Sequence, residues 1–244
     1  PIGLSGALPA HASCGAAFCT LNTAWETQGA WTEPGMRLDL RYEYISQDQL
    51  RHATDRVAVG QISRHHDEVK TLNRNLMATF DYTMDQAWGL SLQAPFVDRS
   101  HDHIHNHDDG DQSSERWDID GLGDVRVLAR HRLSAARGHS ETCGILFGAK
   151  LPTGDTDKRN AAGSLAERTL QPGTGTTDAI LGVYYNTLIL LQERPTTVFA
   201  QATVQAPLDS YDRFSPGDQL AFDVGLRYPL SPTWQGLLQT NVLF

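Results

Sequence analysis

Residues 36–45 alternate strictly between apolar and charged side chains. The apolar or aromatic positions are Met36, Leu38, Leu40, Tyr42 and Tyr44, and the charged positions between them are Arg37, Asp39, Arg41 and Glu43. Successive side chains of a β-strand point to opposite faces, so this pattern predicts a strand with one apolar and one charged face. The apolar face could pack on the core of a soluble protein, or it could meet lipid while the charged face lines a wet lumen.

Eight further segments alternate in a similar way, which predicts about nine strands and almost no helix. They cover residues 76–82, 88–96, 125–132, 145–151, 179–185, 198–206, 220–228 and 234 onward. Long polar connections at residues 46–71, 99–123, 152–177 and 209–218 alternate with short ones. Bacterial outer-membrane barrels keep their short turns on the periplasmic side and their long loops outside.

Aromatic residues recur near the expected strand ends, as the interface girdles of a membrane barrel require. They are Tyr42, Tyr44, Tyr82, Trp88, Tyr185, Tyr228 and Trp234. We therefore predict an all-β, antiparallel, transmembrane up-and-down β-barrel in the bacterial outer membrane. Single-chain barrels have an even strand number and must close, so we expect 10–12 strands in the complete barrel, with C-terminal strands missing here. A soluble β-barrel that binds an apolar ligand is the alternative that periodicity leaves open.

We expect the partners of this barrel to be the lipid bilayer and a small-molecule solute, and not nucleic acid. The formal net charge of −9 argues against nucleic acid, and no run of eighteen apolar residues predicts a membrane helix. Residues 1–12 are small and apolar and end in Ala-His-Ala, which predicts the remnant of a signal peptide, against a plain flexible terminus. Residues 13–35 would be a periplasmic lead-in and residues 36–244 the barrel. Cys14 and Cys19 could form a disulfide in an oxidising compartment or half of a metal site.

Charged side chains on the polar faces are candidates for the lumen wall, because a dry core could not hold so many of them. The candidate lumen residues are Arg37, Asp39, Arg41, Glu43, Arg126, Arg130, Asp223 and Arg227. We expect them to form ion pairs that fill the pore or select what passes through it.

Histidines concentrate in one long polar connection. His101, His103, His105 and His107 alternate with other residues, and His65 and His66 lie in the preceding long connection. In an extended segment the first four would project on one side, and imidazole suits zinc and copper. The stretch therefore predicts a surface metal-binding barrel as an alternative function, against a solvated, pH-sensitive loop.

Three glycine-containing segments occur in a familiar order: Gly121-Leu-Gly-Asp-Val125, Lys150-Leu-Pro-Thr-Gly154 and Leu170-Gln-Pro-Gly-Thr-Gly-Thr-Thr-Asp178. Together they resemble a family of outer-membrane β-barrel transporters associated with the meta-pathway of phenol degradation. The resemblance covers roughly residues 37–244. It implies a channel or transporter for small molecules, including hydrophobic or aromatic ones. No phosphate-binding loop, nucleophile elbow or HExxH motif is present, so we expect no enzymatic activity.

Overall fold

The computed structural model describes residues 34–52, 55–61, 66–107, 111–134 and 141–244, and these contain β-strands but no helix. No described helix could therefore cross a membrane. The strands are β1 (Gly35–Gln47), β2 (Arg51–His52), β3 (Asp55–Arg56), β4 (His66–Thr83), β5 (Trp88–Asn106), β6 (Gln112–Leu122), β7 (Val125–Ser134), β8 (Glu141–Leu151), β9 (Asp178–Leu191), β10 (Arg194–Pro207), β11 (Gln219–Pro229) and β12 (Gln235–Leu243). The predicted leader, most of the lead-in, Cys14, Cys19 and His65 lie outside the described residues.

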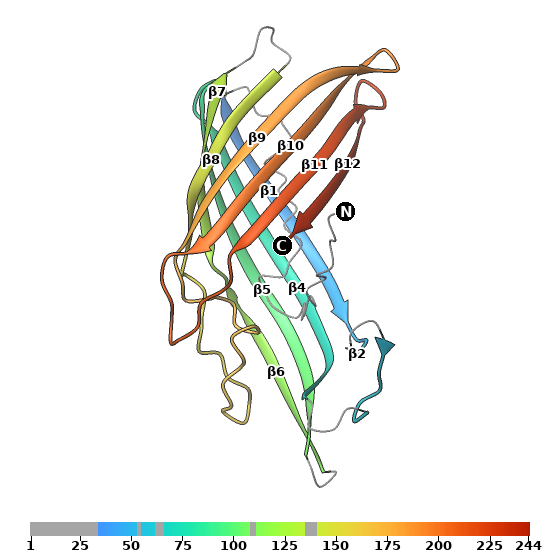
Figure 1. The fold of residues 1–244 in the computed structure, drawn as a ribbon, viewed down its shortest axis with the longest axis vertical. Helices are drawn as coiled ribbons and strands as arrows, with labels where there is room; N and C mark the ends of the chain where they lie inside the picture. The colour runs from blue at the N-terminus through green and yellow to red at the C-terminus, as the bar shows by residue number, and fades with distance from the viewer. Residues whose placement is uncertain (1–33, 53–54, 62–65, 108–110, 135–140) are drawn as a thin grey trace, which may run out of the picture.

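One antiparallel sheet contains every strand except the small β2–β3 pair. Its order is β1-β4-β5-β7-β8-β9-β10-β11-β12, and β6 pairs with β5 beside this path. The strands of the wall thus follow one another in chain order, which is the up-and-down connectivity that the alternating pattern predicts. The sheet curls into a half-barrel (Figure 1), the form of an incomplete β-barrel. The all-β antiparallel prediction and the number of about nine strands in the wall are confirmed.

Short connections lie at one end of the half-barrel and long ones at the other (Figure 1). Between β9 and β10, Gln192 and Glu193 have φ of 50° and 63°, the left-handed values of a tight hairpin turn whose twist matches its strands. Between β4 and β5, the Asp85 carboxylate accepts hydrogen bonds from the backbone N–H groups of Ala87 and Trp88, both at 2.7 Å. These bonds stabilise the charged carboxylate and lower the pKa of Asp85.

The two faces of the sheet have opposite chemistry. On the outer face, apolar side chains are exposed: Met36 is 73% exposed, Leu38 63% and Leu181 64%. On the inner face, polar side chains such as Thr79, Asp81 and Gln93 are buried. A soluble protein buries its apolar face and exposes its polar one, so this polarity is reversed. The alternation read from residues 36–45 is present as expected, because β1 pairs with β4 over its whole length without a register shift.

Residues 99–123 were expected to form a polar loop, and this expectation is wrong. β5 continues to Asn106 and pairs with β6, so the segment is a long β-hairpin. Similarly, β4 begins at His66 inside the stretch expected to be a loop. The hairpin was not predicted because polar residues predominate along it, which weakens the strand pattern while leaving strand pairing intact.

The outer face of β5 changes character between Phe96 and Asp98. Its outward positions are Trp88, Leu90, Leu92, Ala94 and Phe96, followed by Asp98, Ser100, Asp102, Ile104 and Asn106. From Trp88 to Phe96 the strand advances eight steps of about 3.4 Å, roughly 27 Å along its own axis, which at a tilt of about 35–45° spans roughly 20 Å of an apolar band about 25 Å tall in outer-membrane barrels. Just beyond this band, Asp98 pairs with Arg74 of β4 at 2.7 Å. The rest of the hairpin therefore projects beyond the apolar band.

Candidate functional site

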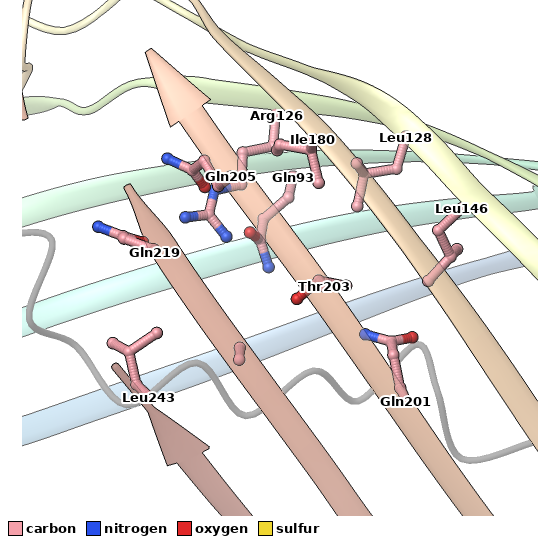
Figure 2. A pocket seen from close by; sticks show the side chains of 11 residues that line it. Gln93, Arg126, Leu128, Leu146, Ile180, Gln201, Thr203, Gln205, Gln219 and Leu243 are labelled. Atoms are coloured by element: carbon pink, nitrogen blue, oxygen red, sulfur yellow. The ribbon is translucent and has the colours of Figure 1, made fainter. Parts of the chain in front are cut away.

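A hollow on the inner face of the half-barrel is the first candidate site (Figure 2). It is lined by Gln93, Arg126, Leu128, Leu146, Ile180, Gln201, Thr203, Gln205, Gln219, Ala221 and Leu243. These residues come from β5 and from β7 through β12. Gln93 and Gln219 belong to strands that are far apart in the sheet order, so they share one hollow only because the sheet curls.

The lining of this hollow combines amides with apolar patches. Four glutamine side chains and the Arg126 guanidinium offer hydrogen-bonding groups, while Leu128, Leu146 and Ile180 offer apolar surface. Amides can donate and accept without a fixed charge. The hollow could therefore contact a small molecule that has an apolar body and one or two polar groups, which is the usual character of a small-molecule site.

Of the eight candidate lumen residues, Arg126 lines this hollow. The other seven also lie on the inner face, since they alternate with the outward apolar positions of β1, β7 and β11. Several have polar partners: Arg37 pairs with Asp81 at 2.8 Å, and Arg41 pairs with Glu43 at 3.1 Å. Arg130 donates to Thr83 at 3.2 Å, and Asp223 accepts a hydrogen bond from Asn241.

A buried ion cluster lies where the strands meet the long loops. Lys150 Nζ, at the end of β8, contacts the carboxylates of Asp124 at 3.1 Å and Asp178 at 3.2 Å. The side chains of Lys150, Asp124 and Asp178 are 6%, 7% and 2% exposed, so all three charges are buried. The hydroxyls of Thr174 and Thr176 complete the set around the ammonium. We call these five residues the mouth cluster.

The mouth cluster was not predicted as one site, because its members lie in three separate segments of the chain. Each of the three glycine-containing segments contributes to it: Asp124 from the first, Lys150 from the second, and Thr174, Thr176 and Asp178 from the third. The lysine of the second segment meets the carboxylates of the other two only when the three segments are brought together, and strand register and loop path decide that.

Glycine is required where two of these segments cross. A Cβ on Gly154 would lie 2.6 Å from the Cα and 2.8 Å from the N of Gly173, and 2.9 Å from the C of Gly123. All three are backbone atoms, so no side-chain rotation relieves the overlap. The close approach lets the Gly154 N–H donate to Asp124 at 3.0 Å and the Thr174 N–H donate to the same carboxylate at 2.9 Å. The crossing therefore holds the 152–177 loop against the end of β7.

We expect Gly154→Ala to destabilise the protein by about 1–3 kcal/mol, the usual cost of overpacking a tight contact. The added methyl would separate the Gly154 and Gly173 backbones and lengthen both hydrogen bonds to Asp124. Urea unfolding of the variant in detergent micelles would measure the change. Gly163→Ala in the same loop tests only backbone strain, because a Cβ there meets nothing within 4 Å although φ is +86°. Equal stability of Gly154→Ala and wild type would contradict the close-approach argument.

The 152–177 loop also packs on the inner face of the β5–β6 hairpin. Trp117, Ile119, Ala166 and Leu170 form a buried apolar cluster there. Arg99, which is 1% exposed, donates from Nη1 to the backbone carbonyls of Thr169 at 3.1 Å and Leu170 at 3.0 Å. The hairpin and the loop thus form one packed unit beyond the apolar band, at the long-loop end of the half-barrel.

Histidines on this unit separate into different environments. His101 bonds through Nδ1 to Thr71 Oγ1 at 2.7 Å, and His107 bonds to Ser113 at 3.2 Å. His103 and His105 instead converge on Glu115 of β6, a residue that sequence analysis did not select. The backbone of His66 pairs with that of His105. Among the described residues, the predicted histidines therefore do not come together as one site. The group that converges consists of His103, His105 and Glu115.

The carboxylate of Glu115 has a lowered pKa. Burial disfavours its charged form, but hydrogen bonds from His105, Ser164 and His103 outweigh that cost. Glu115 therefore carries a negative charge beside two imidazoles at neutral pH. The ring of His103 also lies 4.6 Å from that of Trp117, centroid to centroid, which fixes its position from the other side.

No protein-family model matches the chain, and no curated protein matches it.

Proposed function

We propose that the chain forms the wall of an outer-membrane channel or transporter for small molecules, including hydrophobic or aromatic ones. The observation that carries this proposal is the reversed polarity of the sheet, with exposed apolar side chains outside and buried polar side chains inside. Lipid on the outer face would cover Met36, Leu38 and their neighbours, while water and ion pairs would occupy the inner face. Membrane barrels have this arrangement strand by strand.

The distribution of short and long connections supports one orientation of the barrel in the membrane. The short turns would face the periplasm and the long loops the outside, so the hairpin, the 152–177 loop and the mouth cluster would form the extracellular mouth. Trp88 at the short-turn end and Phe96 at the other end of the β5 band lie where interface aromatics are expected. The hollow of Figure 2 would then lie in the path between the two ends.

The family resemblance supports the same function. The segments that carry it supply the mouth cluster and the Gly154–Gly173 crossing. Motifs that hold an extracellular loop in place would suit a transporter wall that has to keep one shape at its entrance. The amides and apolar side chains of the hollow favour a solute with an aromatic or aliphatic body and few polar groups.

Reconstitution of the closed barrel in a planar bilayer tests the channel, because an open sheet edge is not stable in lipid. We expect discrete conductance steps, and we expect Arg126→Glu to lower the chloride-over-potassium permeability ratio by about twofold or more, because pore-lining charge sets ion preference. Arg116→Glu is the matched control, since Arg116 is exposed on β6 and paired with Asp118 at 2.9 Å. A protein that never conducts, or an equal change in both variants, would contradict the proposal.

The soluble barrel with an apolar ligand makes a different prediction. It would remain monodisperse without detergent, whereas a membrane wall with this outer face would aggregate or partition into vesicles. Sedimentation of the purified protein with and without lipid vesicles separates the two.

A further inference from the structure

The β5–β6 hairpin brings three metal-ligating groups to one point. His103 Nε2 and His105 Nε2 are 2.9 Å apart, and they lie 3.2 Å and 3.3 Å from Glu115 Oε2. Ligand atoms bound at about 2.05 Å and roughly 90–109° apart around one zinc ion would be separated by about 2.9–3.3 Å. The three distances therefore match the edges of one coordination sphere.

Strand pairing explains why these groups meet. His103 and His105 are two residues apart on β5, so they share a face. Glu115 is the direct cross-strand partner of His103, and directly opposed residues in an antiparallel pair project to the same face. The arrangement is thus set by backbone register and does not depend on a flexible loop.

Neighbouring residues hold the ligand side chains in position. Ser164 Oγ donates to the second oxygen of Glu115 at 3.2 Å, and Trp117 Nε1 donates to the Ser164 carbonyl at 3.3 Å. The side chain of His103 is 2% exposed, whereas those of His105 and Glu115 are 38% and 32% exposed. One side of the group is therefore packed, and the other is open to an arriving ion and a water ligand.

We propose that His103, His105 and Glu115 form a binding site for one divalent transition-metal ion at the mouth of the barrel. Two imidazoles and one carboxylate suit Zn²⁺ and Cu²⁺, and the open side leaves a coordination position for water. The bound ion would join β5 to β6 and, through Ser164, to the 152–177 loop. The proposed metal site does not depend on whether the barrel conducts, and it lies beyond the apolar band.

Titration calorimetry of the untagged, detergent-solubilised protein with ZnCl₂ and with CuCl₂ tests the site. We expect one ion per chain. His105→Gln and Glu115→Gln should each weaken binding at least about tenfold, as losing one of three ligands removes more than a supporting contact does. Both residues are partly exposed, so both variants are expected to fold, and circular dichroism would check this.

His107→Gln is the matched control, because His107 lies beside the same hairpin but bonds to Ser113. Its affinity should equal that of wild type. Absence of saturable binding would overturn the proposal. So would a loss in His107→Gln as large as that in His105→Gln, since it would indicate adventitious binding by a histidine-rich surface.

Discussion

Replacing Lys150 by Met is expected to lower the free energy of unfolding by about 3–5 kcal/mol, the cost of removing one partner from a buried ion pair. The ammonium lies between the carboxylates of Asp124 and Asp178, and all three residues are buried. Methionine preserves most of the volume but leaves two buried carboxylates facing each other without a cation. Their repulsion and desolvation should loosen the ends of β8 and β9 and release the 152–177 loop.

Lys158→Met is the matched control for this prediction. Lys158 pairs with Asp155 at 2.9 Å, but their side chains are 32% and 53% exposed, and exposed pairs contribute about 0–1 kcal/mol. Urea unfolding followed by tryptophan fluorescence would measure both variants in the same micelles. Limited proteolysis would report loosening of the 152–177 loop in the Lys150 variant. Similar, small losses in both variants would show that the mouth cluster is not a structural core.

The wall of the half-barrel could be predicted from sequence because each of its strands carries its own evidence. Alternation with a period of two is imposed locally by backbone geometry, so residues 36–45 indicate the two faces of β1 without reference to any other strand. Chain-order pairing then follows from short turns, such as the one at Gln192 and Glu193. The register of β1 with β4 agrees with the pattern at every pair from Gly35–Thr83 to Gln47–Thr71.

The extended hairpin and the mouth cluster could not be predicted, for two physical reasons. Beyond Phe96 the outer face of β5 carries mostly polar residues, so the apolar half of the pattern disappears while the strand continues. Lys150, Asp124 and Asp178 lie in three segments that are well separated along the chain, and only the paired register of β7, β8 and β9 brings them together. Cross-strand partners such as Glu115 are hidden in the same way, because nothing in the 101–107 stretch indicates which residue of β6 will face it.

Substitutions on the outer face test directly whether lipid covers that face. Leu92 lies in the middle of the apolar band of β5. Leu92→Arg is expected to destabilise the protein in lipid vesicles by about 2–4 kcal/mol, the cost of a cationic side chain near the bilayer midplane. Ser100→Arg places the same charge on the same face of the same strand, beyond Asp98. Its cost should be about 0–1 kcal/mol, the value near the interface.

The two variants distinguish lipid from water as the neighbour of this face. Leu92 is 43% exposed, and surface substitutions in a soluble protein usually change stability by no more than about 0.5 kcal/mol. If water covered the face, Leu92→Arg and Ser100→Arg would cost equally little. Equilibrium unfolding in vesicles measures the difference between them directly. A clearly larger cost for Leu92→Arg identifies lipid at Leu92, because the charge and the strand are the same in both proteins and only the depth changes.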